Sequence, residues 1–245
     1  MLFCALCSAR MRAALPVFLA LIAGCSGGGS GGDSPGGFVR VEHRRNSDGA
    51  EATVARAEFS DVARTRPARG RCAVPEPAVD GTWRDVGEAV TLTRSGTEPL
   101  VLPRATLGSL VVYGADGLPA LASPVGAQLD VTLAGNEEIE ARTWEDAVEI
   151  PAALEPGELL NQIGFSADQT LSWAPSDVEE VLLEIASGAE PALVCRARGR
   201  DGELVIPESQ NAELFSGGGS VVYRAVIRRH TTLDGDAVAL EGQSV

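Results

Sequence analysis

Beyond residue 37 the chain is a succession of short segments in which apolar and polar residues alternate. In residues 127–135, Leu129, Val131 and Leu133 share one face, because successive side chains of a strand point to opposite sides of the sheet. Glycine, proline and other turn residues separate these segments at fairly regular spacing. The pattern predicts strands at 38–45, 52–59, 87–95, 99–103, 109–114, 127–135, 138–144, 147–151, 169–175, 179–187, 192–198, 202–207, 220–233 and 236–242.

Two segments also carry helical signals. Ser176 followed by Glu179 resembles a helix cap, yet the residues that follow alternate at Val181, Leu183 and Ile185, which favours a strand. Residues 207–215 start with proline and glutamate, as helices often do, and indicate one short helical turn.

Many short strands with little helix favour an all-β fold, a sandwich or a barrel, and we predict an antiparallel β-sandwich. The folded portion, roughly 205 residues, suits one large sandwich or two small ones. Residues 154–168 are the least patterned stretch and the best candidate boundary. We therefore divide the folded portion into an N-terminal β region, 38–153, and a C-terminal β region, 154–245.

The start of the chain is typical of a secretory signal peptide. Residues 13–24 are apolar and uncharged, and Arg10 and Arg12 precede them. The run is shorter than the roughly 20 apolar residues that a membrane-spanning helix needs. Starting the chain at Met11 gives a more compact leader than starting it at Met1. Cys4 and Cys7 lie before Met11, in a segment that the mature protein would lack, so we assign no chemistry to them.

The apolar run ends in Ile22-Ala23-Gly24-Cys25, which resembles the bacterial lipobox. The resemblance implies removal of residues 1–24 and lipidation of Cys25, and two or more acyl chains give stable anchoring. The alternative is an ordinary signal peptide that ends near a cysteine. Residues 25–37 then form the lipidated cysteine and a Gly/Ser tether with a reach of about 20 Å. Ser26 after the lipidated cysteine favours the outer membrane over the inner membrane.

Composition narrows the possible functions. All 20 basic residues are arginine, which excludes the lysine-dependent phosphate loop, Schiff-base chemistry and the S-x-x-K motif. A net charge of −14 makes nucleic acid an improbable partner. One basic run stands out, at Arg64, Arg66, Arg69 and Arg71. It either contacts anionic headgroups or polysaccharide, or is a solvated loop, and we favour the solvated loop.

Two cysteines remain in the mature chain besides Cys25. An even number in an oxidising compartment indicates a disulfide between Cys72 and Cys195, and two separate buried thiols are the alternative. In the chain-entropy model, closing a loop of about 100 residues stabilises a protein by about 4–5 kcal/mol.

Other polar groupings do not match a known catalytic or metal-binding pattern. His43 and His230 lack further ligands at zinc spacing, and we expect both at the surface of strands. Asp234, Asp236 and Glu241 lack the spacing of a calcium loop, and we expect a plain turn there. An acidic group could serve a carboxylate-based hydrolase, although a solvated strand edge is favoured. Its members are Glu137, Glu138, Glu140, Glu145 and Asp146.

The C-terminal half resembles uncharacterised secreted lipoproteins of high-GC Gram-negative bacteria, which carry a lipobox. The matching positions are Asp168, Trp173, Pro175, Cys195, Asp201, Gly202, Ile206 and Pro207. The resemblance implies an immunoglobulin- or fibronectin-like sandwich and no activity. The residues themselves suggest structural roles: Trp173 fills a core, Pro175 ends a strand, and Asp201-Gly202 turns a hairpin.

We therefore expect a lipid-anchored protein of the cell envelope, more specifically of the outer membrane, that binds an envelope protein or a glycan. The expectation includes no enzymatic activity, no cofactor and no metal. A carboxylate-based envelope hydrolase and a structural or assembly factor of the envelope are the alternatives.

Overall fold

A computed structural model describes residues 37–45, 49–61, 66–74, 82–118, 124–155, 168–186, 191–209 and 220–245. The signal peptide, Cys25 and nearly all of the tether lie outside this range. The strands are β1 (Gly37–Arg45), β2 (Glu51–Phe59), β3 (Arg71–Ala73), β4 (Ala89–Thr93), β5 (Leu100–Leu107), β6 (Leu110–Leu118), β7 (Gln128–Leu133), β8 (Arg142–Glu149), β9 (Gln169–Ser172), β10 (Glu180–Ala186), β11 (Pro191–Ala197), β12 (Glu203–Ile206), β13 (Ser220–Leu233) and β14 (Asp236–Ser244). One 3-10 turn, η1 (Gly199–Asp201), stands between β11 and β12.

The prediction of an all-β protein is confirmed, including the choice of a strand, β10, at 180–186. Two details differ. The predicted strands 138–144 and 147–151 are one strand, β8, in which a bulge with Asp146 at φ 47° interrupts the alternation. The pattern also missed β3, because three residues are too few to show a period of two.

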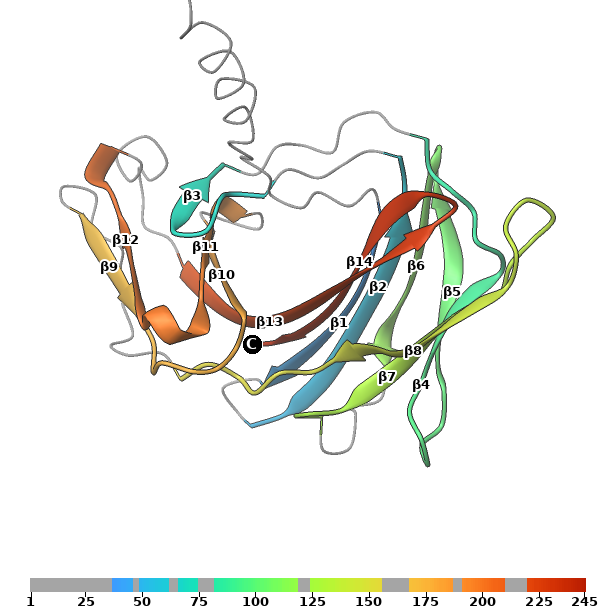
Figure 1. The fold of residues 1–245 in the computed structure, drawn as a ribbon, viewed down its shortest axis with the longest axis horizontal. Helices are drawn as coiled ribbons and strands as arrows, with labels where there is room; N and C mark the ends of the chain where they lie inside the picture. Colours follow the sequence, from blue (N-terminus) through green and yellow to red (C-terminus); the bar gives the residue numbers. More distant parts are fainter. Residues whose placement is uncertain are drawn as a thin grey trace, which may run out of the picture. The chain divides into compact units, whose positions relative to one another are not determined.

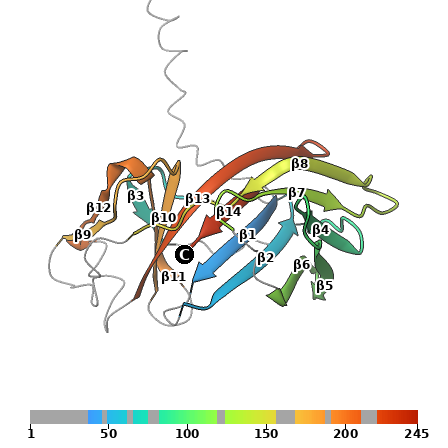
Figure 2. The same ribbon diagram turned by 90° about the horizontal axis from the view of Figure 1, so that it is seen from below.

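Twelve strands form one sheet, in the order β3-β11-β10-β13-β14-β1-β2-β6-β5-β4-β7-β8 (Figures 1 and 2). Strands β9 and β12 form a separate two-stranded sheet. The expected antiparallel pairing holds throughout the described ladders except between β1 and β14, which run parallel. Strands β13 and β14 lie between β10 and β1, so the large sheet continues across the predicted boundary at residue 154.

Two hydrophobic clusters occupy the same face of the large sheet, since Tyr223 in one and Leu233 in the other are both odd-numbered residues of β13. The larger cluster contains Val39, Leu102 and Leu133, and is enclosed where the sheet curls and β8 contacts β13 and β14 (Figure 2). At this contact Ser244 Oγ donates to the Pro151 carbonyl at 2.6 Å.

The smaller cluster lies between the large sheet and the β9–β12 sheet. Trp173 is 3% exposed and packs here with Leu183 and Ile206, and its indole Nε1 donates to the Gly199 carbonyl at 2.8 Å. Cys72 and Cys195 belong to the same cluster and form a disulfide, which confirms the predicted pairing.

The predicted hairpin at Asp201-Gly202 is wrong. Gly202 does adopt a positive φ of 71°, but it ends η1 and leads from β11 in the large sheet to β12 in the small one. The Asp201 carboxylate closes this turn by accepting from the Arg198 backbone N–H at 3.1 Å. A Cβ atom on Gly202 would lie 3.0 Å from Cγ of Pro175, so this glycine and this proline are close neighbours.

No helix in the described parts of the chain combines the length and apolar character that crossing a membrane requires.

Candidate functional site

The face of the large sheet opposite the hydrophobic clusters carries charged residues on neighbouring strands. On β1, Val39 and Val41 enter the larger cluster, so Arg40 and Glu42 point the other way. The same alternation operates on β10, β11, β13 and β14. We call the resulting surface the charged face, and its members are Arg40, Glu42, Arg44, Glu180, Glu184, Arg196, Arg224, Arg228, Glu241 and Gln243.

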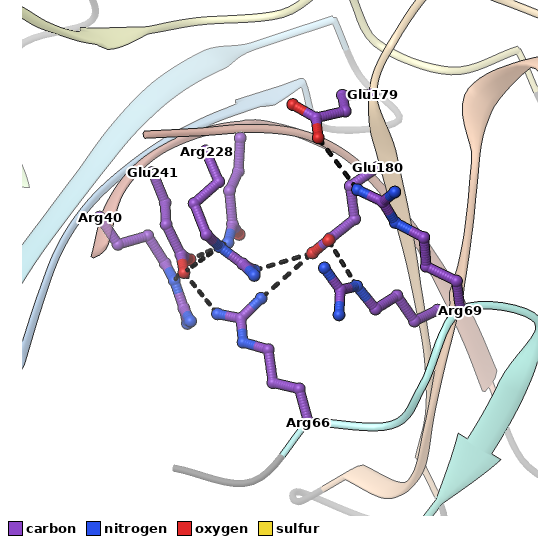
Figure 3. Close-up of polar contacts among 9 residues, drawn as sticks. Arg40, Arg66, Arg69, Glu179, Glu180, Arg228 and Glu241 are labelled. Carbon is purple, nitrogen blue, oxygen red and sulfur yellow. Dashed lines mark hydrogen bonds and ion pairs between the residues drawn. The ribbon is translucent and has the colours of Figure 1, made fainter. Parts of the chain in front are cut away.

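Strand register brings opposite charges together on the charged face. Arg228 of β13 lies directly across from Glu241 of β14, and Glu241 lies across from Arg40 of β1. The side chain of Glu241 is 0% exposed. Its carboxylate accepts from Arg228 Nε at 3.0 Å and from Arg40 Nε at 3.2 Å (Figure 3). It also accepts from Gln243 Nε2 at 3.0 Å.

Glu180 of β10 forms the second centre of the same cluster. It accepts from Arg228 Nη2 at 2.7 Å and from Arg196 Nε at 2.5 Å, and its side chain is 4% exposed. Arg228 therefore binds both buried carboxylates, one on each neighbouring strand. Burial raises the pKa of Glu180, against the opposing charge of Arg196. Its ionisation thus depends on the arginines that surround it.

Arg66 also bridges the two buried carboxylates, although it does not belong to the sheet. It precedes β3, its side chain is 16% exposed, and it contacts Glu180 at 3.3 Å and Glu241 at 2.5 Å (Figure 3). The interpretation of the arginine run as a solvated loop is therefore wrong for Arg66. Arg69 fits that interpretation better, since its pair with Glu179 at 2.9 Å is exposed. Arg64 lies outside the described residues.

A second set of ion pairs continues the charged face on the same strands. Glu42 pairs with Arg44 and Arg224, and Arg224 Nε lies 2.9 Å from Glu184. Burial alone would raise the pKa of Glu42, but the hydrogen bond from Arg44 and the charge of Arg224 outweigh it and hold this pKa below its usual value.

Two sequence interpretations change with these positions, those of Glu241 and His43. Glu241, grouped with Asp234 and Asp236 in a turn, is a buried partner of arginines, whereas Asp236 pairs with Arg84. His43 is buried rather than at the surface, and His230 is exposed as expected. The five carboxylates of the acidic group at 137–146 are exposed.

A shallow hollow of about 490 Å³ lies near the acidic group and is lined in part by Asp85, Arg104 and Glu137. Two of the lining side chains, Asp85 and Arg104, bind each other. Asp85 accepts from the Tyr113 hydroxyl at 3.0 Å and pairs with Arg104 at 2.8 Å. Burial raises the pKa of Tyr113 to about 12, and the bond to Asp85 acts in the same direction. These contacts indicate a structural role for the Asp85 and Tyr113 pair.

Within the described ranges, no group of three or more His, Cys, Asp and Glu side chains is placed to hold a metal ion. Among the described residues, the network of buried ion pairs around Glu180 and Glu241 lies on the charged face. The ion pairs between its carboxylates and guanidiniums link β10, β13, β14 and β1 and hold these strands in register.

Comparison with known proteins gives no family. No protein-family model matches the sequence, and no curated protein is significantly similar to it.

The lowered pKa of Glu42 predicts a pH dependence of stability. A carboxylate with a lowered pKa stabilises the folded state above its unfolded value of 4.5, and this stabilisation is lost as the pH falls through the lowered pKa. Urea unfolding should therefore show a higher free energy of unfolding for the wild type than for Glu42→Gln at pH 7. This difference in the free energy of unfolding should shrink at pH 3. An equal difference at pH 7 and at pH 3 would contradict a lowered pKa of Glu42.

Proposed function

We propose that this chain is an exported, lipid-anchored protein of the cell envelope whose β-sheet domain displays a binding surface and catalyses no reaction. The observation that carries the proposal is the Cys72–Cys195 disulfide, because such bonds persist in oxidising compartments outside the cytoplasm. The sequence before residue 26 supplies the export signal and the lipid attachment site at Cys25.

Binding rather than catalysis is supported by the way the chain uses its buried charges. Glu180 and Glu241 are surrounded by arginines on adjacent strands, an arrangement that fixes the sheet. In proteins generally, binding residues are found disproportionately on loops that a rigid scaffold positions. The Gly/Ser tether gives this domain about 20 Å of reach from the bilayer. An envelope protein or a glycan is the ligand class that we propose, at the outer membrane.

Replacing Cys25 with alanine tests the anchor. The lipobox cysteine is the lipid attachment site, so Cys25→Ala should leave the protein in the soluble fraction or unprocessed in the membrane. Cell fractionation followed by intact mass measurement distinguishes these forms from the wild type. Ser26→Ala is a matched control and should remain lipidated. A Cys25→Ala protein that stays in the membrane with the mature wild-type mass would overturn the proposal.

The binding role is tested with the soluble chain that starts at Ser26. We expect saturable binding to an envelope protein or to a glycan on an array, with no turnover of the bound molecule. Reproducible turnover of an envelope substrate would contradict the non-catalytic role.

A further inference from the structure

Arg66, which precedes β3, attaches this part of the chain to the charged face. Strand β3 is at one edge of the large sheet and pairs with β11. Arg66 lies beyond β11 and contacts Glu180 of β10 and Glu241 of β14.

Residues 66–74, which we call the strap, bury little apolar surface of their own. Most of their side chains are exposed, and Cys72 is the member that packs in a hydrophobic cluster. Strand β3 pairs with β11 over only three residue positions. Segments with few buried apolar contacts open at low free-energy cost. Without a covalent bond, the strap would depend on its ion pairs and this short ladder.

The ion pairs of the strap are not essential to the charged face beneath it. When Arg66 leaves, Glu180 keeps Arg196 and Arg228, and Glu241 keeps Arg40 and Arg228. The larger hydrophobic cluster contains no strap residue. The sheet therefore has the contacts to remain folded when the strap is detached.

We propose that the Cys72–Cys195 disulfide latches the strap to β11 and so keeps Arg66 on the charged face, and that its reduction releases the strap while the sheet stays folded. Closing the latch is a thiol–disulfide exchange: the two thiols reduce a disulfide carrier of the envelope to its dithiol, and a bond forms between the two sulfur atoms. The chain would then close over Glu180 and Glu241 only after export. This inference rests on the proposed export of the chain, but it is independent of the lipid anchor.

Hydrogen exchange of the mature chain from Cys25 onward, in detergent, tests the latch. The backbone N–H of Gly70 donates to the Arg196 carbonyl at 2.7 Å, so peptides spanning 66–74 report the attachment of the strap. Adding a dithiol reductant should speed exchange in these peptides at least tenfold. Exchange in the β13–β14 hairpin should change less than twofold.

A double variant, Cys72→Ala with Cys195→Ala, should match the reduced protein without any reductant. The matched control is Arg45→Met, which removes an ion pair distant from the strap and should leave exchange in 66–74 unchanged. Unchanged exchange in the reduced strap would overturn the proposal, and so would an equal rise in the strap and the β13–β14 hairpin. Neither result bears on lipidation at Cys25, which the fractionation experiment decides separately.

Discussion

Replacing Gly242 with alanine is expected to destabilise the folded protein severely, and replacing it with valine should prevent stable folding. A Cβ atom at this position of β14 would lie 1.7 Å from the Glu149 carbonyl oxygen and 3.1 Å from the Ile150 backbone nitrogen. These are backbone atoms at the end of β8, where the sheet curls around its larger hydrophobic cluster. Overpacking typically costs about 1–3 kcal/mol, and a clash with backbone should reach or exceed the upper end.

The matched control is Gly114→Ala on β6, where a Cβ atom would lie 3.3 Å from the Ala55 carbonyl oxygen. A small relaxation accommodates this contact, so the control should change the free energy of unfolding by less than about 1 kcal/mol. Urea unfolding followed by tryptophan fluorescence compares the variants. If Gly242→Ala unfolds at the wild-type urea concentration, β8 does not close against β14 as described.

The second large effect is expected for Glu241→Gln. The substitution keeps the shape of the side chain but removes the negative charge that Arg40, Arg66 and Arg228 share. Breaking a buried ion pair on one side typically costs about 3–5 kcal/mol, because the remaining charge is left in a poorly hydrated place. Urea unfolding at pH 7 should show a loss of this size.

The control for this variant is Glu51→Gln, which removes one exposed pair with Arg45. Exposed pairs contribute little to stability, so the control should unfold as the wild type does. If Glu241→Gln and Glu51→Gln shift the unfolding midpoint equally, the charged face does not stabilise the sheet.

The strands could be predicted because a period of two is visible in the sequence, as at Leu129, Val131 and Leu133. Their partners could not be predicted, because strand order depends on contacts between distant segments. The parallel pairing of β1 with β14 joins the two ends of the folded chain, and nothing within either segment specifies it. The same holds for Asp201-Gly202. The sequence predicted a turn there, but it could not show that the turn leads to a strand of another sheet.

The charged face was missed for a related physical reason. Polar positions that alternate with apolar ones usually face water, so Arg40 and Glu42 on β1 indicated an exposed side of the strand. A signal was present, because arginine and glutamate occur at alternate positions on several strands and can pair across them. What the sequence could not show is that Glu241 is buried, or that Arg66 reaches it from a distant segment.

The most direct test of the account is the non-reducing mass of the mature protein isolated from the membrane of the cell that makes it. We predict a chain that begins at acylated Cys25 and contains Cys72 linked to Cys195. A chain that retains residues before Cys25, or that carries free thiols at Cys72 and Cys195, would contradict it.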